Sequence, residues 1–180
     1  MDKEMLKYNC EFVETEKYKA FETSKFPKMK TAIVTCMDTR LVELLPAALG
    51  IKNGDVKMIK NAGGTVDEPF GSTMRSLLIA IYELGVENVM IIGHTTCGVE
   101  GMNAEEIMNV MRERGIEKET FRMISNCGID LESWLTGFSD LKKAVKKSVD
   151  MVRNHPLITP DITVRGYIMD TATGKLQPLD

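Results

Sequence analysis

The chain has 180 residues, of which 43% are hydrophobic and 27% are charged, so we expect one globular domain with an apolar core and a solvated surface. The formal net charge of −3 argues against a nucleic-acid-binding protein, whose surface is usually basic. No apolar run is long enough to span a membrane, and residues 1–7 lack the apolar centre of a signal peptide. A cytoplasmic protein is therefore expected, with its four cysteines as thiols or metal ligands rather than disulfides.

The N-terminal part of the chain predicts a helix followed by a buried strand. Residues 3–21 carry a narrow stripe of apolar side chains at helical spacing, so this helix must dock on its own domain or on a partner subunit. We therefore divide the predicted domain, residues 1–180, into an N-terminal helical arm over 1–28 and an α/β core over 29–180. The apolar, β-branched segment 31–35 predicts a strand that is buried on both faces.

Strands and helices alternate through the rest of the chain. Strands are predicted at 56–59, 89–92 and 162–168, and a turn at Thr173-Gly174 precedes a short return segment. Helices are predicted from Ser72, as a cap, to about Gly85, as one or two helices over 103–135, and from the cap Ser139-Asp140 to about residue 154. This alternation predicts an α/β fold with a mostly parallel central sheet flanked by helices.

Two short motifs follow predicted buried strands and carry metal-binding side chains. The first is TCMDTR at 35–40, and the second is GHTTCG at 93–98. Functional groups collect beyond the carboxyl ends of parallel strands, so we expect the two motifs to lie together. Cys36, His94 and Cys97 would then supply two thiolates and an imidazole, which is a ligand set that suits Zn²⁺.

Two roles are open for Asp38. It could be the fourth zinc ligand, or Arg40 could hold it in a bidentate contact so that water occupies the fourth position. In the second case zinc lowers the pKa of the bound water, and Asp38 accepts the hydrogen bond of the resulting hydroxide and orients it. Two thiolates already neutralise the ion, so we expect a less acidic water than at a tris-histidine zinc and a rate that rises with pH from neutral to alkaline.

Together with the loop Asn-Ala-Gly-Gly at 61–64, the two motifs resemble those of the β-class carbonic anhydrases, in their compact, short-chain branch. The likeness covers about residues 30–99 and, more weakly, the closing segment 157–174. One departure is Lys60, where the compact branch is expected to carry an arginine with its planar donor fork.

The resemblance implies reversible hydration of carbon dioxide to bicarbonate and a proton. It also implies a homodimer or a higher homo-oligomer in which the N-terminal helix packs on a neighbour. The site it implies consists of three zinc ligands, Cys36, His94 and Cys97, and of a catalytic pair, Asp38 and Arg40, at the fourth position. His155 is the remaining histidine, and the sequence suggests no route by which it could carry protons from the metal.

Two other functions remain open. One is a related zinc hydrolase of carbon disulfide or carbonyl sulfide, because the same activated water would attack either carbon. The other is a non-catalytic zinc protein, such as a bicarbonate sensor, in which all four zinc positions are closed. The presence of both Asp38 and Arg40 argues against the non-catalytic alternative.

Overall fold

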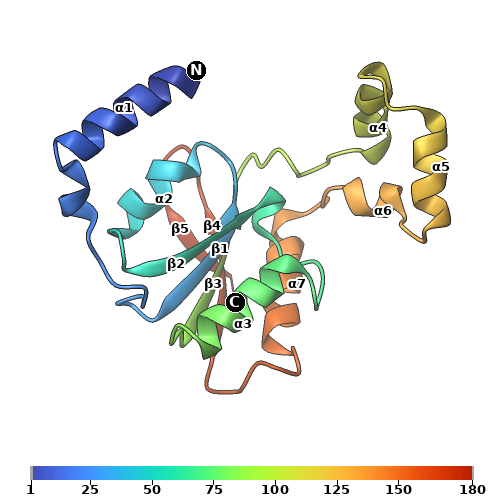
Figure 1. The fold of residues 1–180 in the computed structure, drawn as a ribbon. Coiled ribbons are helices and arrows are strands. Elements are labelled where there is room, and N and C mark those ends of the chain that lie inside the picture. Colours follow the sequence, from blue (N-terminus) through green and yellow to red (C-terminus); the bar gives the residue numbers. More distant parts are fainter. Residues whose placement is uncertain (1, 180) are drawn as a thin grey trace.

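The computed structural model describes residues 2–179 and contains a five-stranded sheet with helices on both faces (Figure 1). Its strand order is β2-β1-β3-β4-β5. The first four strands in the chain are parallel, whereas β5 is antiparallel to β4. The predicted α/β fold is thus confirmed, and the predicted return segment is the fifth strand. The strands are β1 (Thr31–Cys36), β2 (Val56–Asn61), β3 (Asn88–His94), β4 (Thr163–Met169) and β5 (Leu176–Leu179).

Helices connect these strands, and two short 3₁₀ turns accompany them. Within residues 2–179, none of the helices combines the length and the apolar character needed to cross a bilayer. The α-helices are α1 (Asp2–Glu14), α2 (Leu41–Leu49), α3 (Ser72–Tyr82), α4 (Ala104–Glu113), α5 (Lys118–Asn126), α6 (Leu131–Leu135) and α7 (Leu141–Arg153); the 3₁₀ turns are η1 (Lys17–Phe21) and η2 (Ala62–Gly64).

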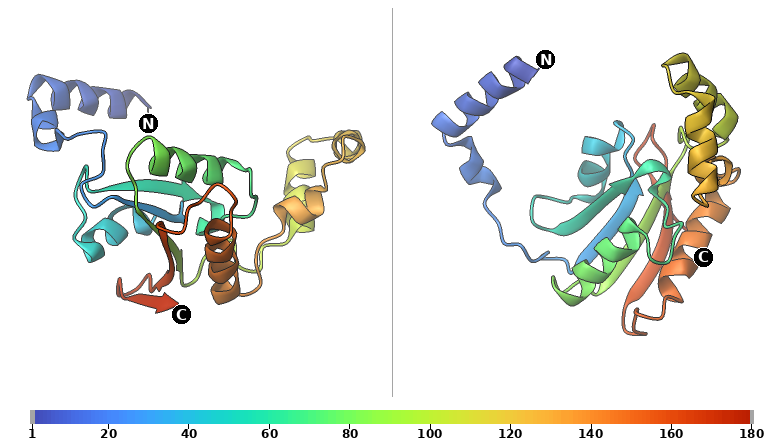
Figure 2. Two further views of the ribbon diagram at one scale, coloured as in Figure 1. Left: turned by 90° about the horizontal axis from the view of Figure 1, so that it is seen from below. Right: turned by 45° about the vertical axis from the view of Figure 1, so that its right-hand side comes forward.

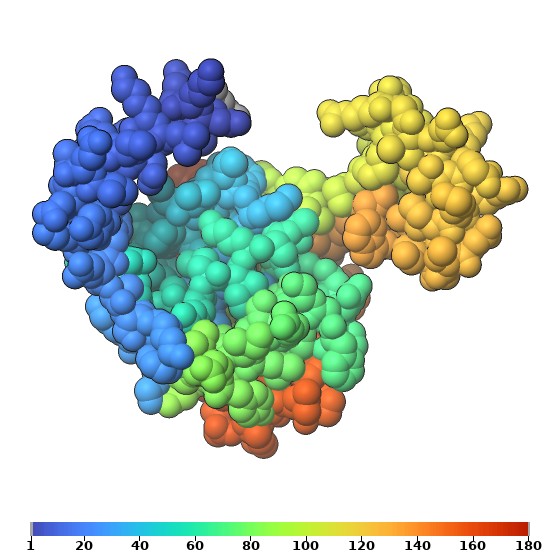
Figure 3. Space-filling view, in the orientation of Figure 1, coloured from blue at the N-terminus to red at the C-terminus, as the bar shows by residue number. Residues whose placement is uncertain are grey.

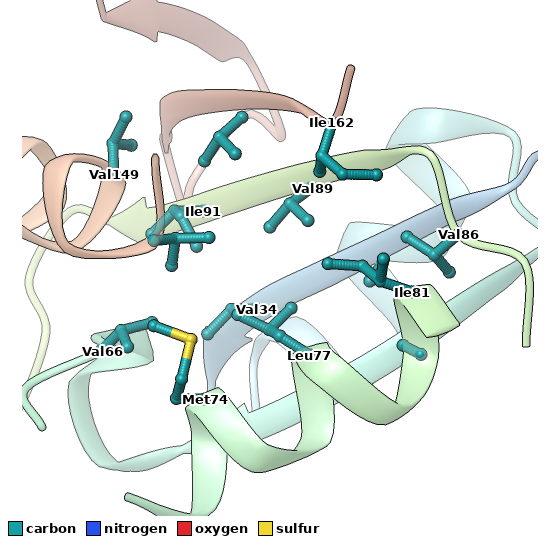
Figure 4. Close-up of a cluster of buried hydrophobic side chains, with 14 of the residues drawn as sticks. Val34, Val66, Met74, Leu77, Ile81, Val86, Val89, Ile91, Val149 and Ile162 are labelled. Atoms are coloured by element: carbon teal, nitrogen blue, oxygen red, sulfur yellow. The ribbon is translucent and has the colours of Figure 1, made fainter. Parts of the chain in front are cut away.

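Two apolar clusters fasten the helices to opposite faces of the sheet. On one face, Val34 and Ile91 lie in the cluster that α3 and α7 also line, part of which Figure 4 shows. On the other face, Ile33 and Ile92 pack with Leu41 of α2. Neighbouring residues of β1 and of β3 therefore point into different clusters, so both strands are buried on both faces as predicted. The second view of Figure 2 shows α3 and α7 lying over the same side of the sheet.

The predicted helix at 3–21 is wrong as a single element. The α-helix ends at Glu14, and residues 17–21 form the separate turn η1. Between them Glu16 has a φ of 54°, a left-handed conformation that cannot continue a right-handed helix. The N-terminal segment consequently contains two short pieces rather than one long rod.

Two further helix predictions need correction. Residues 103–135 form three helices rather than one or two, because the chain turns at Gly115 and at Gly128. Ser72 is the first residue of α3 and not its cap, and the helix ends at Tyr82. In contrast, Asp140 caps α7 as predicted, since its carboxylate accepts a 3.0 Å hydrogen bond from the backbone N–H of Lys143.

Two helical segments project away from the sheet on opposite sides of the molecule (Figures 1 and 3). The first comprises α1 and η1, which contain no buried residue among those described. The second comprises α4, α5 and α6, in which α4 and α5 contact α6. The two ends of this second segment are joined by a hydrogen bond, in which the N–H of Gly137 donates to the carbonyl of Met102 over 2.9 Å. The sheet therefore forms the body, and both segments leave apolar side chains in solvent.

The close approach of η2 to the end of β1 yields a stability prediction. A Cβ on Gly64 would lie 2.7 Å from the backbone nitrogen of Cys36, and Gly64 has a φ of +66°. Gly50 has nearly the same φ, +65°, and no atom of a non-adjacent residue within 2–179 lies within 4 Å of its Cβ position, so a substitution there isolates the effect of φ. We expect Gly50→Ala to cost about 1 kcal/mol and Gly64→Ala at least about 3 kcal/mol of unfolding free energy, measured by urea denaturation. Equal losses would show that the contact with β1 is unimportant.

Candidate metal centre

The candidate site lies where the strand order of the sheet reverses. From β1 the chain moves to β2 on one side, and it then returns to β3 on the other side of β1. Ligands of open parallel sheets bind at such a switch point, beyond the carboxyl ends of the strands. Cys36 is the last residue of β1 and His94 the last of β3, and the turn after β3 contains Cys97.

Three potential ligand atoms converge at this point. The sulfurs of Cys36 and Cys97 are 3.8 Å apart, and together with a ring nitrogen of His94 they all lie within 4.8 Å of one another. All three residues are buried. Two sulfurs and an imidazole nitrogen at this spacing could hold one metal ion.

The hydrogen bonding of His94 supports the same conclusion. Its Nδ1 lies 2.9 Å from the carbonyl oxygen of Thr95, which can only accept, so the tautomer that satisfies this contact has its proton on Nδ1 and its lone pair on Nε2. Nε2 is buried, and within residues 2–179 it has no hydrogen-bond partner. A buried polar atom without a partner is costly, and a metal ion would satisfy it. The donor set therefore fits a transition metal of the zinc type.

Both thiols lie in an apolar environment. Cys36 and Cys97 belong to the cluster that α2 packs against. Burial raises the pKa of the Cys97 thiol above its usual value. Because the thiolate is the metal ligand, a proton competes with the metal at this position, and metal affinity should increase as the pH rises toward that raised pKa.

Asp38 lies beside the three ligands but is paired with Arg40. Its Oδ2 is 3.9 Å from Nε2 of His94. Arg40 donates from its backbone N–H and from Nε to Oδ1, both over 2.9 Å, and from Nη2 to Oδ2 over 2.7 Å. These bonds hold the pKa of Asp38 well below its usual range and raise that of Arg40, so the pair remains charged. Of the two arrangements open for Asp38, the structure has the one with the bidentate arginine.

Sequence reasoning missed the residue that anchors Arg40. Nη1 of Arg40 donates to Oγ1 of Thr96 over 2.8 Å, and Nη2 donates to the carbonyl oxygen of Thr96 over 2.9 Å. Thr96 lies between His94 and Cys97 in the second motif, but spacing alone gives no signal for its contact with a residue 56 positions away.

The loop at 61–64 braces the site rather than contributing a ligand. The carbonyl of Asn61 accepts a 2.8 Å bond from the N–H of Met37, which joins the ends of β2 and β1. The side-chain amide of Asn61 donates to the carbonyl of Thr65 over 2.7 Å and to Oγ1 of Thr73 over 2.9 Å. These bonds fix the loop against the first motif and against α3.

A cavity of about 1020 Å³ lies next to the centre, between the start of α3, the segment α6 and α7. Its lining includes Ala62, Val99, Trp134 and Phe138 but none of the three potential metal ligands. Val99 and Phe138 thus line the cavity and also pack against the apolar cluster that contains the two cysteines.

The remaining histidine and cysteines take no part in this centre. His155 is buried, with Nε2 2.8 Å from the carbonyl oxygen of Pro69 and with Nδ1 accepting a 3.2 Å bond from the N–H of Leu157. Both ring nitrogens are therefore occupied by backbone groups. Cys10 and Cys127 are exposed free thiols.

Comparison with known proteins identifies the family. The family model described as carbonic anhydrase matches residues 31–176. A Bacillus subtilis protein named "Putative carbonic anhydrase YvdA" is 50% identical over 172 residues, which cover 96% of this chain and 87% of that protein. A carbon disulfide hydrolase of Acidithiobacillus thiooxidans is 29% identical over 154 residues, covering 81% of this chain and 75% of that protein.

A solved structure agrees with the sequence comparison. The β-carbonic anhydrase isoform I of Trichomonas vaginalis superimposes with a TM-score of 0.88 at 34% identity, covering 99% of this chain and 96% of that one. The match extends over the sheet, both motifs and the projecting segments, because it covers almost the whole of each chain. The chain is therefore a member of the β-class carbonic anhydrase family.

Proposed function

We propose that the protein is a zinc enzyme that catalyses the reversible hydration of carbon dioxide to bicarbonate and a proton. The observation that carries this proposal is the buried Nε2 of His94, which has no hydrogen-bond partner among residues 2–179 and lies among two thiols and beside a carboxylate held by an arginine. Three protein ligands leave a fourth zinc position for water or substrate, as catalytic zinc sites require.

In this proposal the chain's own residues bind the ion and orient the reactants. Cys36, His94 and Cys97 would hold Zn²⁺, which when bound supplies Lewis-acid activation of water near neutral pH. Asp38 is ionised and has its Oδ2 3.9 Å from Nε2 of His94, so it can accept a hydrogen bond from a water molecule beside the ligands. Arg40 keeps the carboxylate in that orientation. Since His155 is engaged by backbone groups, the released proton would leave through solvent or buffer.

The identity of the substrate rests on the relatives. The protein at 50% identity is named "Putative carbonic anhydrase YvdA", whereas the carbon disulfide hydrolase is only 29% identical. This difference favours carbon dioxide over carbon disulfide. The presence of Asp38 and Arg40 as a hydrogen-bonded pair favours an enzyme over a closed, non-catalytic zinc site.

We further propose that the functional form is a homodimer or a larger homo-oligomer. The chain exposes 11916 Å² of surface. A compact monomer of this length would expose about 8,700 Å², so the excess is about 3,200 Å² per chain, or about 6,400 Å² for two chains, which is more than enough for an obligate interface. The projecting helix α1 contributes to this excess with the exposed side chains of Met5, Leu6, Tyr8 and Val13. We infer that a second copy of this chain packs on the apolar face of α1.

The first prediction concerns the ligands. Purified protein should contain about one zinc ion per chain, and Cys97→Ser should lose it, because a hydroxyl replaces a thiolate ligand. Cys127→Ser is the matched control, since Cys127 is an exposed free thiol outside the cluster. Elemental analysis of both variants measures the zinc content directly. Full zinc occupancy in Cys97→Ser would contradict the ligand assignment.

The second prediction concerns the reaction. The zinc-loaded protein should hydrate carbon dioxide in a stopped-flow assay, and Asp38→Ala should keep its zinc but lose turnover by about a hundredfold, the usual size of a proton-handling contribution. Asp161→Ala, which changes an exposed aspartate, serves as the control. Turnover of carbon disulfide without hydration of carbon dioxide would select the hydrolase alternative. Inactivity toward both would select the non-catalytic alternative.

The third prediction concerns assembly. Light scattering coupled to gel filtration should give at least twice the mass of one chain, and Leu6→Asp combined with Val13→Asp should shift the protein toward the monomer. Burying two unpaired carboxylates should raise the dissociation constant by about a hundredfold or more. Lys7→Asp makes the same change of two units in net charge on the polar face of α1 and should leave assembly unchanged. A monomeric parent protein would refute the proposal.

A further inference from the structure

Thr96 adopts a backbone conformation that threonine rarely takes. It is an exposed residue in the turn between His94 and Cys97, and its φ is 53°, in the left-handed region. A β-branched side chain is an outlier in that region, because its Cβ substituents crowd the backbone. Such strain persists only where surrounding contacts compensate for it, and it is concentrated at functional sites.

The contacts of Thr96 are directed at Arg40. Its Oγ1 accepts a 2.8 Å hydrogen bond from Nη1, and its carbonyl oxygen accepts a 2.9 Å bond from Nη2. The same Nη2 also donates to Oδ2 of Asp38 over 2.7 Å. The side chain of Arg40 is 45% exposed, so packing alone does not fix it. Thr96 therefore accepts from Nη1 and Nη2 of the guanidinium, while Asp38 accepts from Nε and Nη2.

This second set of contacts matters because Asp38 and Arg40 belong to the same short segment after β1. Their hydrogen bonds to each other join residues only two positions apart, so these bonds alone do not locate the pair relative to β3. Thr96 supplies that connection, and its turn is itself tied to the segment after β4. There the N–H of Thr171 donates to Oγ1 of Thr95 over 3.1 Å, and the hydroxyls of Thr96 and Thr171 are 3.4 Å apart.

We propose that Thr96 is a positioning residue that fixes Arg40 and thereby keeps Asp38 away from the fourth coordination position of the metal. Oδ2 of Asp38 lies 3.9 Å from Nε2 of His94, so a released carboxylate is close enough to compete with an external ligand for a metal on that nitrogen. The strained turn is tolerated because it directs both the hydroxyl and the carbonyl of Thr96 at the arginine. The inference rests on the proposed metal site and names the residue that keeps it open.

The test measures access to the metal rather than turnover. Protein loaded with Co²⁺ is titrated with azide, and the visible spectrum reports occupancy of the open position. Thr96→Val removes the hydroxyl and keeps the shape, whereas Thr96→Gly removes it and fits the left-handed turn, so at least the glycine variant should fold. Both should bind azide about fivefold more weakly than the parent, because a charge-assisted hydrogen bond is lost and Asp38 competes for the ion. Thr96→Ser, which keeps the hydroxyl, should restore the parent affinity.

Two controls separate positioning from general disturbance of the loop. Thr39→Val removes an exposed hydroxyl beside Arg40 and should leave azide affinity unchanged. In an Asp38→Ala background, Thr96→Val should have no effect, because no carboxylate is left to compete. Unchanged azide affinity in both Thr96→Val and Thr96→Gly would overturn the proposal, and so would an equal weakening in the Asp38→Ala background. If the parent protein binds cobalt and azide but does not hydrate carbon dioxide, the proposed function fails while the role of Thr96 is still measured.

Discussion

Strands β1 and β3 are hydrogen-bonded to each other in parallel, with Thr35 opposite Ile92 in the register. The buried hydroxyl of Thr35 adds a 2.9 Å bond to the carbonyl of Ile92 at the end of this ladder. Because both strands run in the same direction, their carboxyl ends lie at the same edge of the sheet. This pairing brings Cys36 next to His94, although 58 positions separate them. Each of the two residues is the last of its strand, so the sulfur and the imidazole meet beyond the end of the ladder.

The charge balance of the centre explains how such polar side chains can be buried. Without metal, burial raises the pKa of Cys97 and so favours its uncharged thiol, which needs little solvation. With a divalent ion and two thiolates, the net charge of the cluster would again be zero. The ion pair of Asp38 and Arg40 lies at the more exposed rim, where water solvates part of the guanidinium. The fold thus keeps the permanent ion pair at the edge of the site and the potential metal ligands in its interior.

The two helical segments project from the body of the molecule on opposite sides (Figure 3). The apolar side chains of α1 face solvent, and so does Trp134 of α6, which lines the cavity beside the centre. Val99 and Phe138 at the base of the second segment also pack against the cluster around the cysteines. In the proposed oligomer, a neighbour that covers these surfaces would also shape the approach to the metal, so assembly and substrate access would depend on the same residues.

The sequence by itself determined the strands and both motifs, because their signals are local. The β-branched run at 31–35 shows burial on two faces, and ligands two or three positions apart need only one turn to converge. The alternation of strands and helices was likewise enough for the α/β fold. For Asp38 the sequence allowed two arrangements, as a zinc ligand or as the partner of Arg40, and only its hydrogen bonds distinguish between them.

Only the tertiary structure decided the features that depend on distant segments or on single backbone angles. The left-handed residue Glu16 divides the predicted N-terminal helix, and no apolar spacing signals such a break. The contact of Thr96 with Arg40 joins turns that follow two different strands, so it exists only once β1 and β3 are paired. The spacing of apolar residues indicates which side of a helix or strand is buried. The residue that contacts this side from another segment is determined by strand register and turn conformation.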